Sequence, residues 1–163
     1  MVVPLIITYP FMKRITWWPQ FWLGLNFNWG IIVGSASISN HLISVPIILF
    51  YLGSVFWTMG YDTIYGFQDI KDDEKIGIKS TAVKFKKKPK TFLLFVYLVA
   101  ISLWTMSLLM LNENAIKLFF FLSAFTLLLI KVMLTNFKKP SSCNQTFIYN
   151  SYFSFLITVI LFF

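Results

Sequence analysis

The residues best suited to chemistry lie in one stretch, "YDTIYGFQDIKDDEKIGIKST", which runs from Tyr61 to Thr81. Five of the six carboxylates of the chain fall in its first fourteen residues. On a helix, Asp62, Asp69 and Asp73 would share one face, because spacings of seven and four residues bring their side chains within about 40° of each other. Tyr65 would lie about one step around the helix from them. Carboxylates on one face repel each other, so this arrangement predicts a bound cation.

The ligand types favour Mg²⁺, because hard oxygen ligands with no His or Cys nearby suit an ion that takes one or two carboxylates with water and substrate phosphates. Lysines follow the aspartates, so a diphosphate held by Mg²⁺ on one side and by ammonium groups on the other is predicted. In a membrane, the simplest such substrate is a polyprenyl diphosphate, and the metal would make the diphosphate a better leaving group. A solvated loop of mixed charge is the alternative, and it fits Asp72 and Glu74 better than Asp62, which follows a long apolar run.

The composition shows what kind of protein must position these residues. Hydrophobic residues make up 58% of the 163 positions and charged residues 12%, with a mean hydropathy of +0.74. Soluble domains average about 45–50% apolar and about 25% charged residues. The chain is therefore predicted to be an integral membrane protein. A single cysteine, Cys143, excludes an internal disulfide and a Cys-based metal site, and the lone His41 is interpreted as a loop residue.

Apolar runs of about 20 residues predict an all-α, polytopic transmembrane bundle that forms a single domain over residues 1–163. Five full or nearly full spans are predicted, at residues 18–38, 42–67, 91–111, 115–136 and 147–163. Residues 1–12 are apolar but too short to span, so they are interpreted as the tail of a partial N-terminal helix. The connection at residues 68–90 is long, and connections of that length usually carry function.

The net charge of +8 follows the predicted topology and does not indicate nucleic-acid binding. If the spans alternate, Lys13, Arg14, the eight lysines of residues 68–90, Lys138 and Lys139 lie on one side of the membrane. The opposite side carries only Lys117, and Lys131 can reach the basic side from near the end of its helix. The positive-inside rule therefore places residues 68–90 in the cytoplasm, and a bacterial inner membrane is the expected location.

Two stretches resemble one known family. "YDTIYGFQDIKDDEKIGIKSTA" resembles the second Asp-rich motif of the UbiA superfamily of intramembrane prenyltransferases, D-x-x-Y-x-x-x-D-x-x-x-D followed by G-x-K-S. The matching residues are Asp62, Tyr65, Asp69, Asp73, Gly77, Lys79 and Ser80. "YPFMKRITWWPQFWLG", at residues 9–24, is similar to the branch of that family that prenylates 4-hydroxybenzoate for ubiquinone.

The resemblance implies nine transmembrane helices around a central cavity, in which two facing Asp-rich motifs hold Mg²⁺ against the diphosphate. Loss of the diphosphate would give an allylic carbocation, which the aromatic ring attacks from carbon 3. By the same resemblance, Asp69 and Asp73 bind the metal, while Asp62 and Tyr65 line the site.

Two basic residues receive expected roles from the resemblance. Lys79 would meet the diphosphate, and Arg14 would bind either the benzoate carboxylate or the diphosphate. A guanidinium can bind either anion through two parallel hydrogen bonds. An interfacial topology anchor is the other interpretation of Arg14.

The first Asp-rich motif of the family is missing, since no Asp or Glu precedes Asp62. The chain aligns with the later part of the family fold, from the end of the fourth helix to the ninth. We therefore expect it to be inactive alone and to need a complementary N-terminal fragment. Three alternatives remain open: a non-catalytic membrane remnant of a split or decaying gene, a sister prenyltransferase with another acceptor, and a small transporter. The transporter is disfavoured because the aspartates cluster at one membrane edge.

Overall fold

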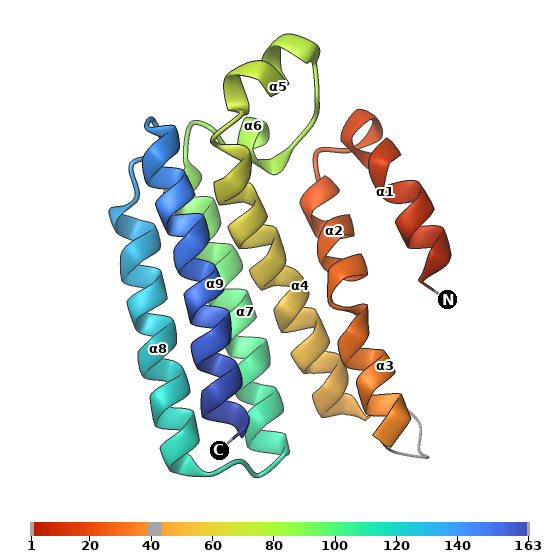
Figure 1. Cartoon of the computed structure of the whole chain (residues 1–163), viewed down its shortest axis with the longest axis vertical. Helices are drawn as coiled ribbons and strands as arrows, with labels where there is room; N and C mark the ends of the chain where they lie inside the picture. Colours follow the sequence, from red (N-terminus) through yellow and green to blue (C-terminus); the bar gives the residue numbers. More distant parts are fainter. Residues whose placement is uncertain (1, 39–43, 163) are drawn as a thin grey trace.

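The computed structural model describes residues 2–38 and 44–162, and within these ranges it contains helices and no strands. Figure 1 shows their arrangement. The helices are α1 (Val3–Ile15), α2 (Pro19–Phe27), α3 (Trp29–Ile38), α4 (Val45–Gly66), α5 (Ile70–Ile76), α6 (Thr81–Lys84), α7 (Pro89–Met110), α8 (Ala115–Leu134) and α9 (Pro140–Phe162). The predicted all-α class is confirmed. The predicted polar connection containing His41 lies outside the described residues.

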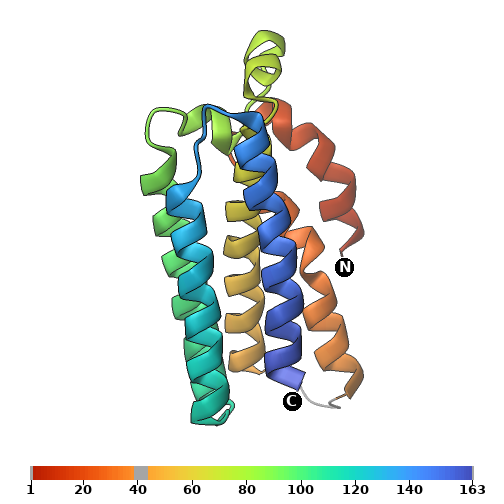
Figure 2. The same ribbon diagram turned by 60° about the vertical axis from the view of Figure 1, so that its left-hand side comes forward.

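Four helices of the described residues, α4, α7, α8 and α9, are long and apolar enough to cross a membrane. Figure 1 and Figure 2 show them running side by side along the long axis of the molecule. The predicted polytopic bundle is therefore confirmed, and the chain is an integral membrane protein. Helix α9 begins at Pro140, earlier than predicted, because its polar first turns have partners: Ser142 Oγ accepts from the backbone N–H of Asn136, and Thr146 pairs with Thr135.

The predicted span at residues 18–38 is not one helix, because α2 ends at Phe27 and α3 begins at Trp29. The side-chain amide of Asn28 donates to the carbonyl oxygen of Gly24 at 2.9 Å and to Thr58 Oγ1 at 2.8 Å. An Asn side chain that bonds the backbone in this way competes with the helical ladder, so the break falls at this residue. In contrast, the stub predicted at residues 1–12 forms α1, which continues three residues beyond Met12 to Ile15.

Helix α4 is the centre of the fold and packs against α2, α3, α6, α7 and α9. Its contact with α7 is close because glycines face large rings. A Cβ on Gly53 would lie 2.6 Å from Trp104 Cδ1, and a Cβ on Gly60 would lie 2.9 Å from Tyr97 Cε2. Only a residue without a side chain admits rings at these distances, and small residues are the usual means of close packing between membrane helices.

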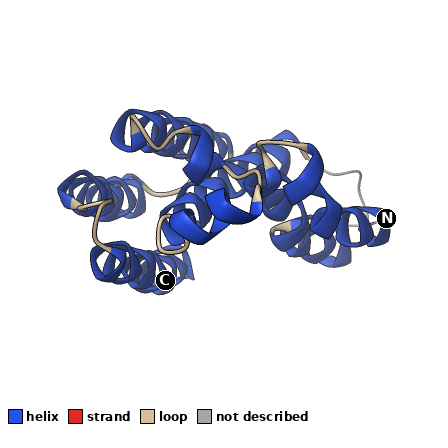
Figure 3. Ribbon diagram, turned by 90° about the horizontal axis from the view of Figure 1, so that it is seen from above, coloured by secondary structure: helices blue, strands red, loops and turns tan. Residues whose placement is uncertain are grey.

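The two ends of the bundle differ in charge, as predicted. Helices α5 and α6 lie at one end, where α1, α4 and α8 finish and α2, α7 and α9 begin (Figure 1). We call this the basic end, since it carries Lys13, Arg14, Lys138, Lys139 and the eight lysines of residues 71–90. Viewed from above, the N-terminal helices lie on one side of the molecule and the C-terminus lies on the other (Figure 3).

Candidate active site

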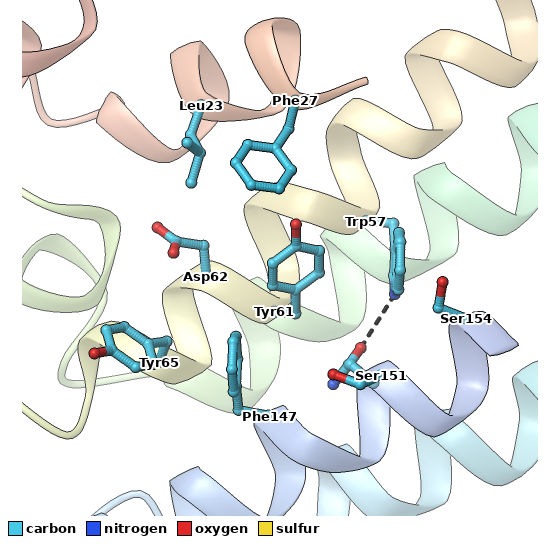
Figure 4. A pocket seen from close by; sticks show the side chains of 10 residues that line it. Leu23, Phe27, Trp57, Tyr61, Asp62, Tyr65, Phe147, Ser151 and Ser154 are labelled. Carbon is cyan, nitrogen blue, oxygen red and sulfur yellow. Dashed lines mark hydrogen bonds between the residues drawn. The ribbon is translucent and has the colours of Figure 1, made fainter. Parts of the chain in front are cut away.

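A cavity of about 520 Å³ lies between α2, α4 and α9. Figure 4 shows its walls, in which five of the ten lining residues are aromatic. The lining residues are Leu23 and Phe27 of α2, Trp57, Tyr61, Asp62 and Tyr65 of α4, and Phe147, Asn150, Ser151 and Ser154 of α9. A largely apolar cavity with a few polar groups is typical of small-molecule sites, and its volume suits a ligand of drug size.

Among the described residues, Asp62 is the one carboxylate that lines this cavity. Figure 4 shows it extending from α4 towards Leu23 of α2. Tyr65 lies one turn further along the same face of α4, and its ring centroid is 5.1 Å from that of Phe147. Asp62 makes no ion pair with the described residues, although the charge of Lys13 on α1 acts on it. Asp62 and Tyr65 therefore lie together on one wall of this cavity.

Asp69 and Asp73 do not share a helical face with Asp62, so that part of the prediction is wrong. Helix α4 ends at Gly66, and the backbone N–H of Gln68 closes a turn onto the carbonyl oxygen of Tyr65 at 2.9 Å. The chain then begins a new helix, in which the carbonyl oxygen of Asp69 accepts from the N–H of Asp73 at 3.0 Å. The predicted loop at residues 68–90 thus contains α5 and α6, and the two aspartates lie one turn apart at the start of α5.

The surroundings of Asp73 are electrostatically mixed. Burial raises the pKa of its carboxyl, the charge of Lys13 opposes this, and the charges of Asp69 and Asp72 raise it further. Among the described residues no three His, Cys, Asp or Glu side chains gather into a complete metal site. Two carboxylates one turn apart still fit Mg²⁺, which takes one or two protein carboxylates and fills its other positions with water and phosphate oxygens.

The G-x-K-S part of the motif folds the chain back onto α1. Gly77 ends α5 with a φ of 73°, a left-handed conformation that suits glycine. Lys79 then bonds α1 twice: its backbone N–H donates to the carbonyl oxygen of Lys13 at 2.9 Å, and its Nζ donates to that of Ile15 at 3.2 Å. Ser80 caps α6 by accepting from the N–H of Val83 at 3.2 Å. Lys79 therefore lies at the end of α1.

Arg14 lies at the same place, in the last turn of α1. Its side chain is exposed, and no hydrogen bond or ion pair joins its guanidinium to the described residues. The structure thus brings Arg14 and Lys79 together at the end of α1, while Asp69 and Asp73 lie on α5 and Asp62 and Tyr65 lie on the cavity wall.

Two residues at this site were not predicted. Lys13 is the basic group whose charge acts on both Asp62 and Asp73. Asn150 is buried on α9, where its Oδ1 accepts from Trp57 Nε1 at 3.1 Å and from the hydroxyl of Tyr97 at 2.9 Å. The hydrogen bond from Trp57 fixes one edge of its ring, which forms part of the cavity wall. An Asn inside an apolar span was the available signal for a functional position.

Comparison with known proteins identifies the class. The model of the UbiA prenyltransferase family matches residues 1–157, and the chain belongs to that family. This result confirms the family predicted from the Asp-rich stretch.

Particular relatives refine the comparison. The chain is 39% identical over 167 residues to the mitochondrial 4-hydroxybenzoate polyprenyltransferase of Dictyostelium discoideum, covering 97% of this chain and 35% of the relative. It is 35% identical over 155 residues to 4-hydroxybenzoate geranyltransferase 1 of Lithospermum erythrorhizon, covering 95% of this chain and 50% of the relative. With the human mitochondrial 4-hydroxybenzoate polyprenyltransferase it shares 48% identity over 89 residues, which cover 55% of this chain and 24% of that protein. The chain thus spans half the length of these relatives or less. No solved structure matches it.

Proposed function

We propose that this chain forms part of an enzyme that transfers a polyprenyl group from polyprenyl diphosphate to carbon 3 of 4-hydroxybenzoate, in ubiquinone biosynthesis. The aromatic-lined cavity beside Asp62 carries the proposal, because it offers an apolar chamber for the prenyl chain next to the charged end of the bundle. The names of the similar relatives support 4-hydroxybenzoate as the acceptor. The alternatives are a non-catalytic remnant and a family member that uses another acceptor.

The residues of the basic end would hold the diphosphate. Asp69 and Asp73 would bind Mg²⁺, which neutralises negative charge on the diphosphate as the carbon–oxygen bond breaks. Lys13 and Lys79 lie at the end of α1 and would attract the remaining negative charge. Arg14 is exposed beside them and suits either the diphosphate or the carboxylate of the acceptor.

The cavity wall would hold the prenyl end of the carbon–oxygen bond that breaks. Asp62 and Tyr65 face the space in which the first carbons of the prenyl chain would lie. The faces of Trp57, Tyr61 and Phe147 attract a cation, so they would stabilise an allylic carbocation while keeping water away from it.

The opposing carboxylates would come from a complementary N-terminal segment. No Asp or Glu precedes Asp62, and the chain spans half the length of its relatives or less. Helix α1 has exposed apolar side chains on which further helices could pack, among them Val3, Ile7 and Phe11, each about 60% exposed. We therefore expect the chain alone to be inactive. The basic end would face the cytoplasm, and a bacterial inner membrane is the proposed location.

The test is a prenyl transfer assay on membranes that hold this chain with or without the N-terminal half of a similar geranyltransferase. We expect Mg²⁺-dependent transfer to 4-hydroxybenzoate only when both parts are present. Asp69→Ala and Asp73→Ala should abolish it, while Asp72→Ala should retain most of it, because Asp72 pairs with Lys75 at the surface.

Three results would count against the proposal. No transfer with the complementary half present would favour a non-catalytic remnant. Full activity in Asp69→Ala or Asp73→Ala would remove that residue from the metal site. Preference for an acceptor without a carboxylate would overturn 4-hydroxybenzoate as the substrate.

A further inference from the structure

A second cavity, of about 810 Å³, lies at the basic end and shares no lining residue with the first. Three parts of the chain meet there: the turn from α4 into α5, the segment that leads into α7, and the connection from α8 to α9. None of the carboxylates assigned to the diphosphate lines it. It is therefore distinct from the aromatic cavity, and its lining residues Gln68 and Ile70 flank Asp69 in the sequence.

Five lysines line this second cavity: Lys71, Lys86, Lys87, Lys90 and Lys138. Lys86 is paired with Glu74. In the described part of the chain no carboxylate lies within ion-pair distance of the other four, so four positive charges surround one cavity without an internal counter-ion. Like charges held close together repel each other, and an anion inside the cavity would relieve that repulsion.

The same cavity also has an apolar side. The ring centroids of Phe67 and Phe137 lie 5.0 Å apart in its wall. Leu134, at the end of the membrane helix α8, is 76% exposed and also lines it. A ligand that matches both sides must carry negative charge at one end and a hydrocarbon chain at the other.

One lining residue also has an unsatisfied donor. Nε2 of Gln68 is buried and has no hydrogen-bond partner among the described residues. Buried donors are normally paired, so an unpaired one needs an explanation, and a bound ligand that accepts the hydrogen bond is one such explanation. A headgroup oxygen in the cavity would supply the missing acceptor once the Gln68 side chain rotates to expose Nε2, which is covered in this structure.

We infer that this lysine-lined cavity binds the phosphate headgroup of an anionic phospholipid, whose acyl chains lie along the exposed end of α8. The headgroup phosphate contacts Lys71, Lys87 and Lys138, one from each of the three parts of the chain that meet there. Basic pockets between membrane helices bind anionic headgroups in this way. The lipid thereby links α5, which carries Asp73, to the ends of α7 and α8.

The experiment compares two triple variants of the purified full chain in an uncharged detergent. The cavity variant combines Lys71→Gln, Lys87→Gln and Lys138→Gln. The control variant combines Lys75→Gln, Lys88→Gln and Lys139→Gln, three exposed lysines close in sequence to the first three that do not line the cavity. Both lose the same charge from the same end of the bundle. Phosphatidylglycerol, phosphatidylcholine and inorganic phosphate are each titrated while the thermal unfolding midpoint is measured.

Phosphatidylglycerol should raise the midpoint saturably in the wild type and in the control variant. The cavity variant should need at least about tenfold more of this lipid, because each lysine near an anionic surface contributes to the affinity. If the cavity variant does not fold, Lys138→Gln and Lys139→Gln alone are compared, and only the first should weaken the response.

Several outcomes would overturn the inference. An equal loss in both variants would mean a general effect of surface charge. An equal response to inorganic phosphate would mean that the hydrocarbon chain is not recognised, and an equal response to phosphatidylcholine would mean that the negative charge is not. Because the measurement is of lipid binding, its result does not depend on whether the prenyl transfer proposal holds.

Discussion

The backbone N–H of Lys79 donates to the carbonyl oxygen of Lys13 at 2.9 Å, which joins the end of the Asp-rich segment to the end of α1. The side chain of Lys13 in turn acts electrostatically on Asp62 at the cavity wall and on Asp73 in α5. Lys13 and Lys79 thus connect the end of α1, helix α5 and the cavity wall on α4, over which the residues of the sequence motif are distributed. The connection matters because α5 makes few other contacts with the bundle.

Lys79→Met should loosen the last turn of α1. The substitution removes the hydrogen bond from Nζ to the carbonyl oxygen of Ile15, which is worth about 1 kcal/mol, or roughly a fivefold change in the open population of that turn. Trypsin should therefore cut after Lys13 and Arg14 several times faster in the variant, as measured by mass spectrometry of the released peptide. Lys75→Met is the control, because Lys75 pairs only with Asp72 at the surface. Equal cleavage rates in the two variants would show that the Lys79 side chain does not hold α1.

The carboxyl of Asp73 should give the chain a specific pH dependence. Burial raises its pKa above the ordinary 3.8, so the folded state holds this proton more tightly than the unfolded state. Its contribution therefore favours folding below pH 3.8 and is lost as the pH rises through the raised pKa. Asp73→Asn cannot ionise, so it should be more stable than the wild type at neutral pH, with a difference that shrinks in acid. Thermal unfolding midpoints over a pH series would measure this.

The matched control for Asp73 is Asp72→Asn, which removes the same charge from the first turn of α5. Carboxylates near a helix N-terminus are stabilising, so the control measures the part of the effect that comes from the helix dipole, together with the small contribution of the exposed Asp72–Lys75 ion pair. A loss of stability at neutral pH that is equal in both variants would show that burial of Asp73 has no energetic consequence.

The long helices were predictable from the sequence because each needs only a run of apolar residues, and the motif around Asp62 was enough to indicate the family. The turn after Gly66 was not predictable from spacing. The spacing of Asp62, Asp69 and Asp73 is compatible with one continuous helix and equally with the two helices, α4 and α5, that the structure contains. The break at Asn28 was also missed, because its side-chain partner Thr58 lies on another helix. Contacts between distant segments decide such details, and hydrophobic periodicity does not encode them.

Asn150 is the clearest example of a residue whose role depends on a contact between distant segments, because it and its partner Trp57 lie 93 residues apart in the sequence. Asn150→Leu would leave the Trp57 N–H and the Tyr97 hydroxyl without their acceptor, at a cost of about 1–3 kcal/mol. Thermal unfolding in detergent should show this loss. Ser151→Ala, the next residue on the cavity wall, should change stability far less.

A double-mutant cycle would separate the hydrogen bond from other effects of the change. Tyr97→Phe should cost less in the Asn150→Leu background than in the wild type, because the acceptor for its hydroxyl is already gone. Strictly additive effects of the two substitutions would mean that this bond does not stabilise the wall that holds Trp57.

The wall formed by α2 depends on Gly24. A Cβ at this position would lie 2.7 Å from the carbonyl oxygen of Val55, a backbone atom that cannot rotate away. Gly24→Ala should therefore push α2 from α4 and destabilise the fold by about 1–3 kcal/mol, the usual cost of overpacking. Gly30 in α3 offers the matched control, since a Cβ there would meet nothing within 4 Å. Gly30→Ala should instead be neutral or stabilise the helix by up to about 1 kcal/mol, because alanine restricts the unfolded chain more than glycine does. Thermal unfolding of the two variants should shift in opposite directions or differ clearly in size, whereas matching shifts would mean that α2 does not pack tightly on α4.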